Sequence, residues 1–215
     1  MWKKHIRGAF FTQSVFLITD RKNHIYNRRN VVKWRKRKSA ENGETADLEK
    51  EETNMYFGVQ MYGVSKEWKQ DPEGFLKKIY EAGYRQIEPC LGFRVDARDY
   101  GFWIPEDLEQ AMPLLAKYHI EVHAVHIFLD EYHYERELAI LTELAQKYHI
   151  SWFVVKSPAR LTKDVLDETA ARYRELAEEL EKAGAGLLIH NEKEDICIRV
   201  NGKTAYEYLL EACGE

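Results

Sequence analysis

After residue 55 the chain alternates between short apolar segments and longer amphipathic segments. Each apolar segment is rich in β-branched and aromatic residues and ends at a polar position, which predicts five strands. The segments span residues 56–62, 84–89, 120–128, 150–156 and 185–191. Gly83, His119, His149 and Gly184 mark the helix ends just before the last four of them. This repeat of helix and strand is typical of a parallel βα array.

The helical segments carry recognisable end signals. Asp71 suits the N-cap of the first helix, Pro72 suits its first position, and Gly83 suits the left-handed position after its end. Pro113 predicts a kink or a late start in the second helix. The predicted helices span about residues 71–82, 106–118, 132–148 and 162–183, with a short final one at 204–213.

The number of strands limits the fold class. A closed (β/α)8 barrel needs eight strands and about 250 residues, whereas 161 residues run from Met55 to Glu215. We therefore expect an α/β fold with about five βα units, either a partial TIM barrel or an open five-stranded sheet. An open edge strand exposes unpaired backbone and apolar side chains, which favours association into a homo-oligomer.

Charge divides the chain into two parts. Residues 1–54 carry 13 Lys and Arg against 7 Asp and Glu, and residues 55–215 carry 19 against 29. We expect residues 1–54 to be a disordered basic arm or a segment that is not natively translated, with Met55 as the alternative start, and residues 55–215 to be the folded domain. An acidic body repels phosphate, so we expect no nucleic-acid partner.

Apolar runs and cysteines indicate the cellular compartment in which the protein is expected. No apolar run is long and uncharged enough to predict a membrane span, and we expect no membrane partner. The three cysteines, Cys90, Cys197 and Cys213, lack the spacing of a disulfide framework or a zinc site. Both observations favour a protein of the reducing cytoplasm.

Polar side chains recur at the carboxyl ends of the predicted strands. Alternation along each strand places Gln60, Glu88, His126, Lys156 and His190 on the inner face. Strand ends of a parallel array converge, so this set predicts a site for a polyhydroxylated or phosphorylated small molecule. The plainer alternatives are a surface acid at Glu88 and a solvent-directed Lys156.

The fifth strand ends in the most specific group. His190 and Asn191 are followed by acids that include Glu192 and Asp195. Imidazole and carboxylate together suit a divalent metal, and carboxylates beside a metal-bound sugar suit abstraction of a proton next to a carbonyl. The alternative is a solvated acidic loop after a strand.

Several of these segments resemble one known family. They are Phe57-Gly-Val-Gln-Met-Tyr-Gly-Val, Asp71-Pro-Glu-Gly-Phe-Leu-Lys-Lys-Ile, Ala82-Gly-Tyr, Ile87-Glu, His190-Asn191 and Asn201-Gly-Lys-Thr. Together they resemble the sugar phosphate isomerase/epimerase family, which has a xylose isomerase-like TIM barrel, over residues 55–215. The resemblance implies a cytoplasmic enzyme of carbohydrate metabolism. Such an enzyme uses Mn²⁺, Mg²⁺, Zn²⁺ or Co²⁺ to isomerise or epimerise a sugar or sugar phosphate by acid/base proton transfer.

The resemblance also implies roles for single residues. Family members often carry His-Asn-His followed by two residues and a Glu, and here Glu192 and Asp195 replace the second His and the Glu. On this basis we assign His190 to the metal and Glu192 and Asp195 to catalysis. The predicted substrate-binding residues are Gln60, Glu88, His126, Lys156 and Asn191. The family draws further ligands and a catalytic acid from strands six to eight, so we expect a truncated barrel with an incomplete active site.

Two other functions remain open at this point. One is a non-catalytic sugar-binding half-barrel that needs a partner chain to supply further strands. The other is an endonuclease IV-like barrel, which binds several zinc ions through many His and acidic residues. The acidic body disfavours the second alternative.

Overall fold

The computed structural model describes residues 57–129 and 133–214. The predicted basic arm at 1–54 lies outside these residues. Within them, no helix combines the length and the apolar character needed to cross a membrane.

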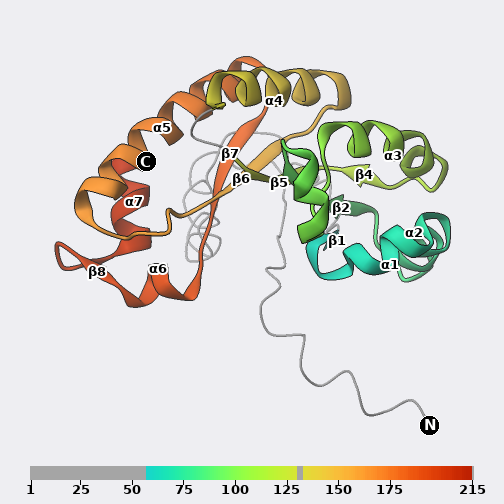
Figure 1. Ribbon diagram of the computed structural model, residues 1–215, viewed down its shortest axis with the longest axis horizontal. Coiled ribbons are helices and arrows are strands. Elements are labelled where there is room, and N and C mark those ends of the chain that lie inside the picture. The colour runs from blue at the N-terminus through green and yellow to red at the C-terminus, as the bar shows by residue number, and fades with distance from the viewer. Residues whose placement is uncertain (1–56, 130–132, 215) are drawn as a thin grey trace, which may run out of the picture.

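The strands form a parallel array that follows chain order (Figure 1). β1 (Gly58–Gln60) pairs with β2 (Gln86–Glu88), and β2 pairs with β4 (Glu121–Val122). A second ladder runs through β3 (Cys90–Gly92), β5 (Ala124–Phe128), β6 (Trp152–Lys156) and β7 (Gly186–His190). All these pairings are parallel. β4 and β5 are halves of the third predicted strand, whereas β3 extends the second strand beyond its predicted end at residue 89. With these pieces joined, the predicted partial (β/α)8 barrel with about five βα units is confirmed.

The strand pairing breaks once at the end of the second predicted strand and once within the third. Pro89 separates β2 from β3, and His123 separates β4 from β5. In the parallel register Ile87 is paired with Val122, whereas Cys90 is paired with His126. The third strand therefore holds one extra residue between these pairs, which is the geometry of a β-bulge. The ladder resumes at His126, whose backbone N–H donates to the Pro89 carbonyl at 2.8 Å.

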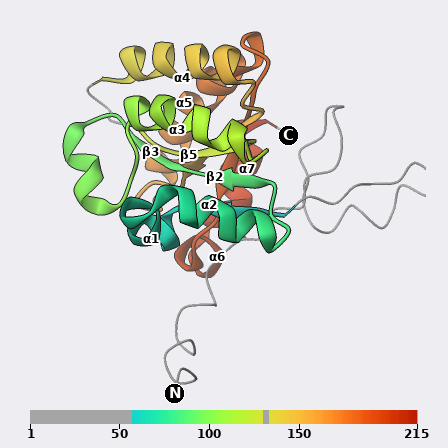
Figure 2. The same ribbon diagram turned by 90° about the vertical axis from the view of Figure 1, so that its right-hand side faces the viewer.

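Helices cover the strands in an arc (Figure 1), and the side view shows α4, α3 and α2 one below another (Figure 2). The α-helices are α1 (Ser65–Gln70), α2 (Pro72–Glu81), α3 (Pro105–Lys117), α4 (Tyr134–Tyr148), α5 (Lys163–Lys182), α6 (Lys193–Cys197) and α7 (Ala205–Cys213). Two 3₁₀ helices, η2 (Tyr62–Val64) and η3 (Val95–Tyr100), and an antiparallel pair, β8 (Arg199–Val200) with β9 (Lys203–Thr204), complete the described elements.

The helix ends confirm the punctuation expected from the sequence. The Asp71 side chain accepts a hydrogen bond from the Gly74 backbone N–H at 2.9 Å and caps α2. The four residues predicted to end helices all have positive φ: Gly83 at 94°, His119 at 51°, His149 at 55° and Gly184 at 83°. α3 begins at Pro105 and runs through Pro113, so the late start considered for this helix does not occur.

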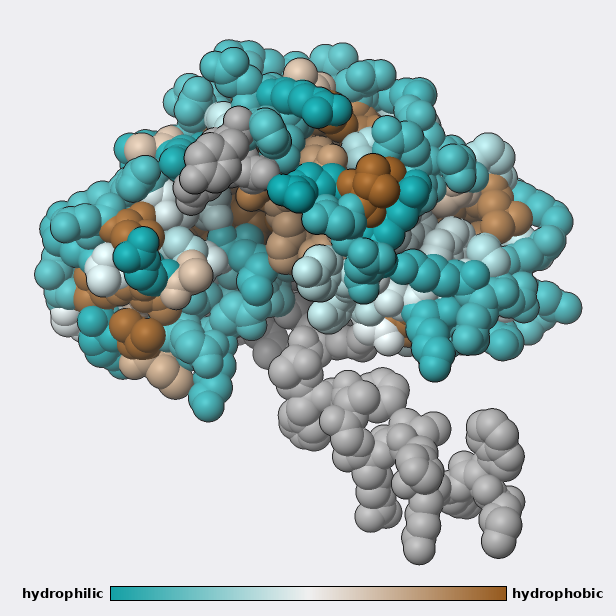
Figure 3. All heavy atoms as spheres, viewed as in Figure 1, coloured by the Kyte–Doolittle hydropathy of each residue, from teal (hydrophilic) through white to brown (hydrophobic). Residues whose placement is uncertain are grey.

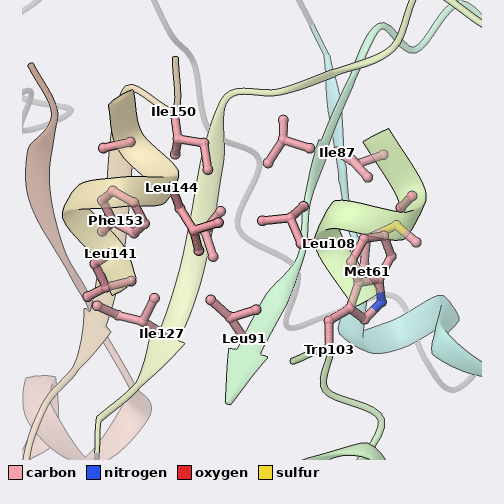
Figure 4. Close-up of a cluster of buried hydrophobic side chains, with 14 of the residues drawn as sticks. Met61, Ile87, Leu91, Trp103, Leu108, Ile127, Leu141, Leu144, Ile150 and Phe153 are labelled. Atoms are coloured by element: carbon pink, nitrogen blue, oxygen red, sulfur yellow. The ribbon is translucent and has the colours of Figure 1, made fainter. Parts of the chain in front are cut away.

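The main core lies between the strands and the helices outside them (Figure 4). Leu91, Ile127 and Phe153 from the strands meet Leu108 of α3 and a pair of leucines of α4, Leu141 and Leu144. Burial of one such side chain stabilises a fold by about 1.5–3 kcal/mol. A second, smaller core lies where α5 packs on α7, around Leu166, Ala170 and Leu209.

The described sheet has two edges. Among the described strands, β1 pairs only with β2, and β7 pairs only with β6. All five residues of β7 are only half-buried. On the face in Figure 3 the apolar side chains form separate patches within a mainly hydrophilic surface, as is usual for water-exposed protein.

Candidate functional site

The polar residues predicted at the strand ends form one continuous series of contacts. Gln60, at the end of β1, donates through Nε2 to Glu88 Oε1 at 3.2 Å. The same Glu88 oxygen lies 3.6 Å from His126 Nδ1. The His126 ring lies beside the His190 ring, with centroids 5.0 Å apart. Residues of β1, β2, β5 and β7 therefore meet at one edge, as a parallel array requires.

The inner half of this series is buried. Glu88 and His126 are 6% and 4% exposed. Neither ring nitrogen of His126 makes a hydrogen bond with the described residues, and Nε2 has no ion-pair contact there either. A buried polar atom without a partner is costly. His126 Nε2 is therefore a buried polar atom of the site that no described residue satisfies.

Aromatic rings extend the site on one side of His126. Its ring stacks on Phe128 with centroids 5.2 Å apart, and Phe128 stacks on Phe102 at 4.3 Å. Sequence reasoning assigned no role to these two phenylalanines. Phe102 belongs to the connection that returns to β3, where the Trp103 backbone N–H donates to the Cys90 carbonyl at 2.8 Å. Only this non-local pairing brings Phe102 to the strand end.

The outer half of the series is an ion pair with a histidine beside it. Lys156 Nζ lies 3.0 Å from Glu192 Oε1, and His190 Nε2 lies 3.7 Å from the same oxygen. The hydrogen bond from Lys156 is the main reason why the pKa of Glu192 lies below its ordinary value. Burial, and then the nearby His126, lower the pKa of His190. The site at neutral pH therefore holds an ammonium, a carboxylate and an uncharged His190 imidazole.

Two predicted residues lie at the margin of the series. Asp195 is 3% exposed, and its carboxylate accepts a hydrogen bond from the Glu192 backbone N–H at 2.7 Å. This contact fixes the start of α6 and the position of Glu192. Asn191 follows β7 and is exposed to solvent. The catalytic role of Asp195 and the binding role of Asn191 stay predictions.

A cavity of about 440 Å³ opens next to the stacked phenylalanines. It lies at the ends of β3 and β5 and is lined in part by Arg94, Phe102, Phe128 and Glu137. Glu137 is almost fully buried in α4, and sequence reasoning missed it. The sequence does contain a clue to Glu137: this acidic residue stands four positions before Leu141, on the face of the helix that packs on the core.

The positions of the His, Cys, Asp and Glu side chains test whether the site could hold the predicted divalent metal ion. Across residues 57–129 and 133–214, no three His, Cys, Asp or Glu side chains come together in an arrangement that could hold a metal ion. His190 has one carboxylate oxygen of Glu192 nearby, and that oxygen already contacts Lys156. The described residues do not fit a divalent ion, so we assign it no part in the chemistry below.

The parallel strand order and the helices outside it define a partial βα barrel, and comparison with solved structures agrees on this fold. No family model and no curated protein matches the chain. Among solved structures it is similar to a sugar phosphate isomerase/epimerase from Parabacteroides distasonis ATCC 8503, with 19% identity and a TM-score of 0.57. A xylose isomerase-like TIM barrel protein from Mycobacterium smegmatis, in complex with magnesium, matches with 15% identity and a TM-score of 0.49.

Both matches cover 72% of this chain and 60% of the other chain. The chain thus spans less than two thirds of the length of these structures. At these identities the similarity shows the fold alone, and the match to the Parabacteroides distasonis structure agrees with the resemblance to sugar phosphate isomerase/epimerase structures that the sequence motifs predicted.

Proposed function

We propose that this chain binds a sugar or sugar derivative at the carboxyl edge of its sheet and acts on it by acid/base proton transfer, as an isomerase/epimerase-like protein. The observation that supports this most strongly is the series Gln60, Glu88, His126, His190, Glu192 and Lys156, which five consecutive strands bring into contact. Within it, the buried Nε2 of His126 lacks a protein partner among the described residues.

Binding follows from the donors and acceptors of the buried half. Glu88 accepts hydrogen bonds, and Gln60 and His126 can donate and accept. A polyhydroxylated ligand offers both kinds of group in each hydroxyl. The stacked rings of Phe102 and Phe128 supply an apolar wall beside these polar groups. Such a wall with a few convergent polar groups is the usual composition of a small-molecule site.

Proton transfer uses the outer half. The Glu192 carboxylate takes the proton from the carbon next to the ligand carbonyl, and the carbon–hydrogen electron pair forms the enediolate. The Lys156 ammonium donates a hydrogen bond to the enediolate oxygen and stabilises its charge. Return of the proton from Glu192 to the neighbouring carbon, together with transfer of the enediol hydroxyl proton to the former carbonyl oxygen, completes an isomerisation. An epimerisation requires a second acid that delivers a proton to the opposite face of the same carbon, so these groups by themselves account for isomerisation. Asp195 is a positioning residue, because it holds the Glu192 backbone.

Calorimetric titration of the full chain with ketoses, aldoses and their phosphates tests binding. Replacement of His126 by Phe keeps a ring and removes both nitrogens, and we expect affinity to fall at least about 10-fold, the effect of about 1.4 kcal/mol. His133→Phe, at the exposed start of α4, is the matched control. Saturable binding that is equal in both variants would contradict this assignment.

Deuterium exchange tests the chemistry separately. A ketose that binds is incubated with the protein in D₂O, and its carbon-bound protons are followed by NMR. We expect exchange at the carbon next to the carbonyl, lost in Glu192→Gln. Binding without exchange would leave the site as a sugar-binding site and remove the proton-transfer part.

A sugar-binding half-barrel completed by a second chain is the other candidate. The half-buried β7, which pairs only with β6 among the described strands, favours it. Sedimentation analysis tests this candidate, since it predicts association that depends on concentration. We do not propose the endonuclease IV-like alternative, because the described residues show no cluster of His and acids that could hold a metal ion.

A further inference from the structure

We propose that the Lys156 ammonium supplies the positive charge at this site in the place where the resemblance to metal-dependent isomerases predicts a divalent cation. The ligand is then bound without a metal. This inference rests on the proposed function for the nature of the ligand, but the cation preference of the site can be tested without any sugar.

The sheet register places the lysine beside the predicted metal ligand. Lys156 and His190 are directly aligned in the parallel ladder of β6 and β7. Aligned residues of neighbouring strands project to the same face, so both side chains emerge together. The Tyr173 hydroxyl donates to the Lys156 carbonyl and holds the end of β6. An ammonium is therefore built into the position next to the imidazole.

Each nearby carboxylate already has a partner. Glu192 Oε1 lies 3.0 Å from Lys156 Nζ. The buried Asp195 accepts from the Glu192 backbone N–H at 2.7 Å. Glu88 lies in the buried half, where it accepts from Gln60. Each of the three carboxylates thus already has one contact, and in the described part of the chain no three His, Cys, Asp or Glu side chains come together to hold a metal ion.

Charge repulsion opposes a metal at the Glu192 oxygen that contacts Lys156. A cation bound to Glu192 Oε1 at the usual distance of about 2.1 Å would lie within about 5 Å of the ammonium. A divalent ion and an ammonium at that separation repel each other strongly. Lys156 is 42% exposed, so its remaining N–H groups can reach a ligand oxygen. One residue thus excludes the metal and takes over its contact with the ligand.

Electron paramagnetic resonance of Mn²⁺, titrated alone into the full chain, tests this inference. We expect no saturable binding by the natural protein. Lys156→Gln should bind one Mn²⁺ saturably, at least 10-fold more tightly than the limit set by the titration of the natural protein, and the added change Glu192→Gln should remove the gain. Lys156→Met provides a second test if the Gln variant does not fold. Lys163→Gln, which breaks an exposed ion pair with Asp167 on α5, is the matched control and should resemble the natural protein.

Two results would overturn the inference. One is saturable binding of one Mn²⁺ by the natural protein that Glu192→Gln abolishes. The other is folded Lys156 variants that bind Mn²⁺ no better than the natural protein. Because no sugar is present, either result leaves the proposed sugar binding to its own test.

Discussion

Lys156, at the end of β6, and Glu192, just after β7, form an ion pair with Nζ and Oε1 3.0 Å apart. Their side chains are 42% and 44% exposed, and an ion pair so accessible to water contributes little to stability. The pair joins the outer end of a polar series that begins in the buried half of the site. We therefore interpret it as part of the ligand site rather than as a support of the fold.

The ion pair predicts a pH response. The hydrogen bond from Lys156 lowers the pKa of Glu192, so the stabilising contact is fully present above the ordinary carboxyl range, near pH 4. It is lost as the pH falls through the lowered folded-state pKa. We expect Lys156→Gln to raise the pKa of Glu192, measured by NMR of its side-chain carboxyl carbon. An unchanged midpoint would mean that the ion pair does not persist in solution.

Asp107 is expected to be important for stability. Its carboxylate accepts two hydrogen bonds from Arg98, at 2.9 and 2.7 Å, and one from the Ile104 backbone N–H at 3.0 Å, at the start of α3. We expect Asp107→Ala to lower the free energy of unfolding by about 1–2 kcal/mol, measured in urea.

The control for Asp107 is Glu109→Ala, on the same helix. Glu109 forms an exposed ion pair with Lys147, so its loss should cost less than about 0.5 kcal/mol. Equal losses in the two variants would show that the cap and the Arg98 contact add nothing.

His149 should limit stability. It lies in the left-handed conformation at the end of α4, with φ 55°, which glycine adopts with less strain. We expect His149→Gly to raise the free energy of unfolding by up to about 1 kcal/mol. His133→Gly, whose φ is −130°, should give no gain. Thermal unfolding followed by circular dichroism distinguishes the two.

Gly186 should tolerate no larger residue. A Cβ added there would lie 2.4 Å from the Trp152 ring on the neighbouring strand. We expect Gly186→Ala to cost about 1–3 kcal/mol of stability. The cost should shrink when Trp152 is replaced by Leu, and a double-mutant cycle measures this coupling. If the two substitutions instead have additive effects on stability, the cost of Gly186→Ala comes from the backbone and not from contact with the Trp152 ring.

The parts of the fold that could be predicted from the sequence depend on local chemistry. The helix ends at Gly83, His119, His149 and Gly184 could be predicted because a left-handed residue leaves a local signal. The gathering of Gln60, Glu88, Lys156 and His190 could be predicted because each ends a strand, and parallel strands end at one edge. His126 joins them although it lies two residues before the end of β5.

Non-local features could not be predicted in the same way. The extra residue between Val122 and His126 appears only when the register with β3 is known. The stack of Phe102 on Phe128 depends on a connection that returns across the strand end. The hydrogen bond by which Asp195 caps the start of α6 was not predicted either, because the sequence shows an acid three residues after Glu192 but not the backbone turn between them.

The most direct test of the ligand site is NMR of the imidazole groups during titration with a sugar phosphate that binds. We predict saturable shifts at His126 and His190, whose rings lie within the polar series, and none at His119, His133 or His149 at the helix ends. Saturable binding that leaves His126 and His190 unchanged would contradict the central claim that this edge of the sheet is the functional site.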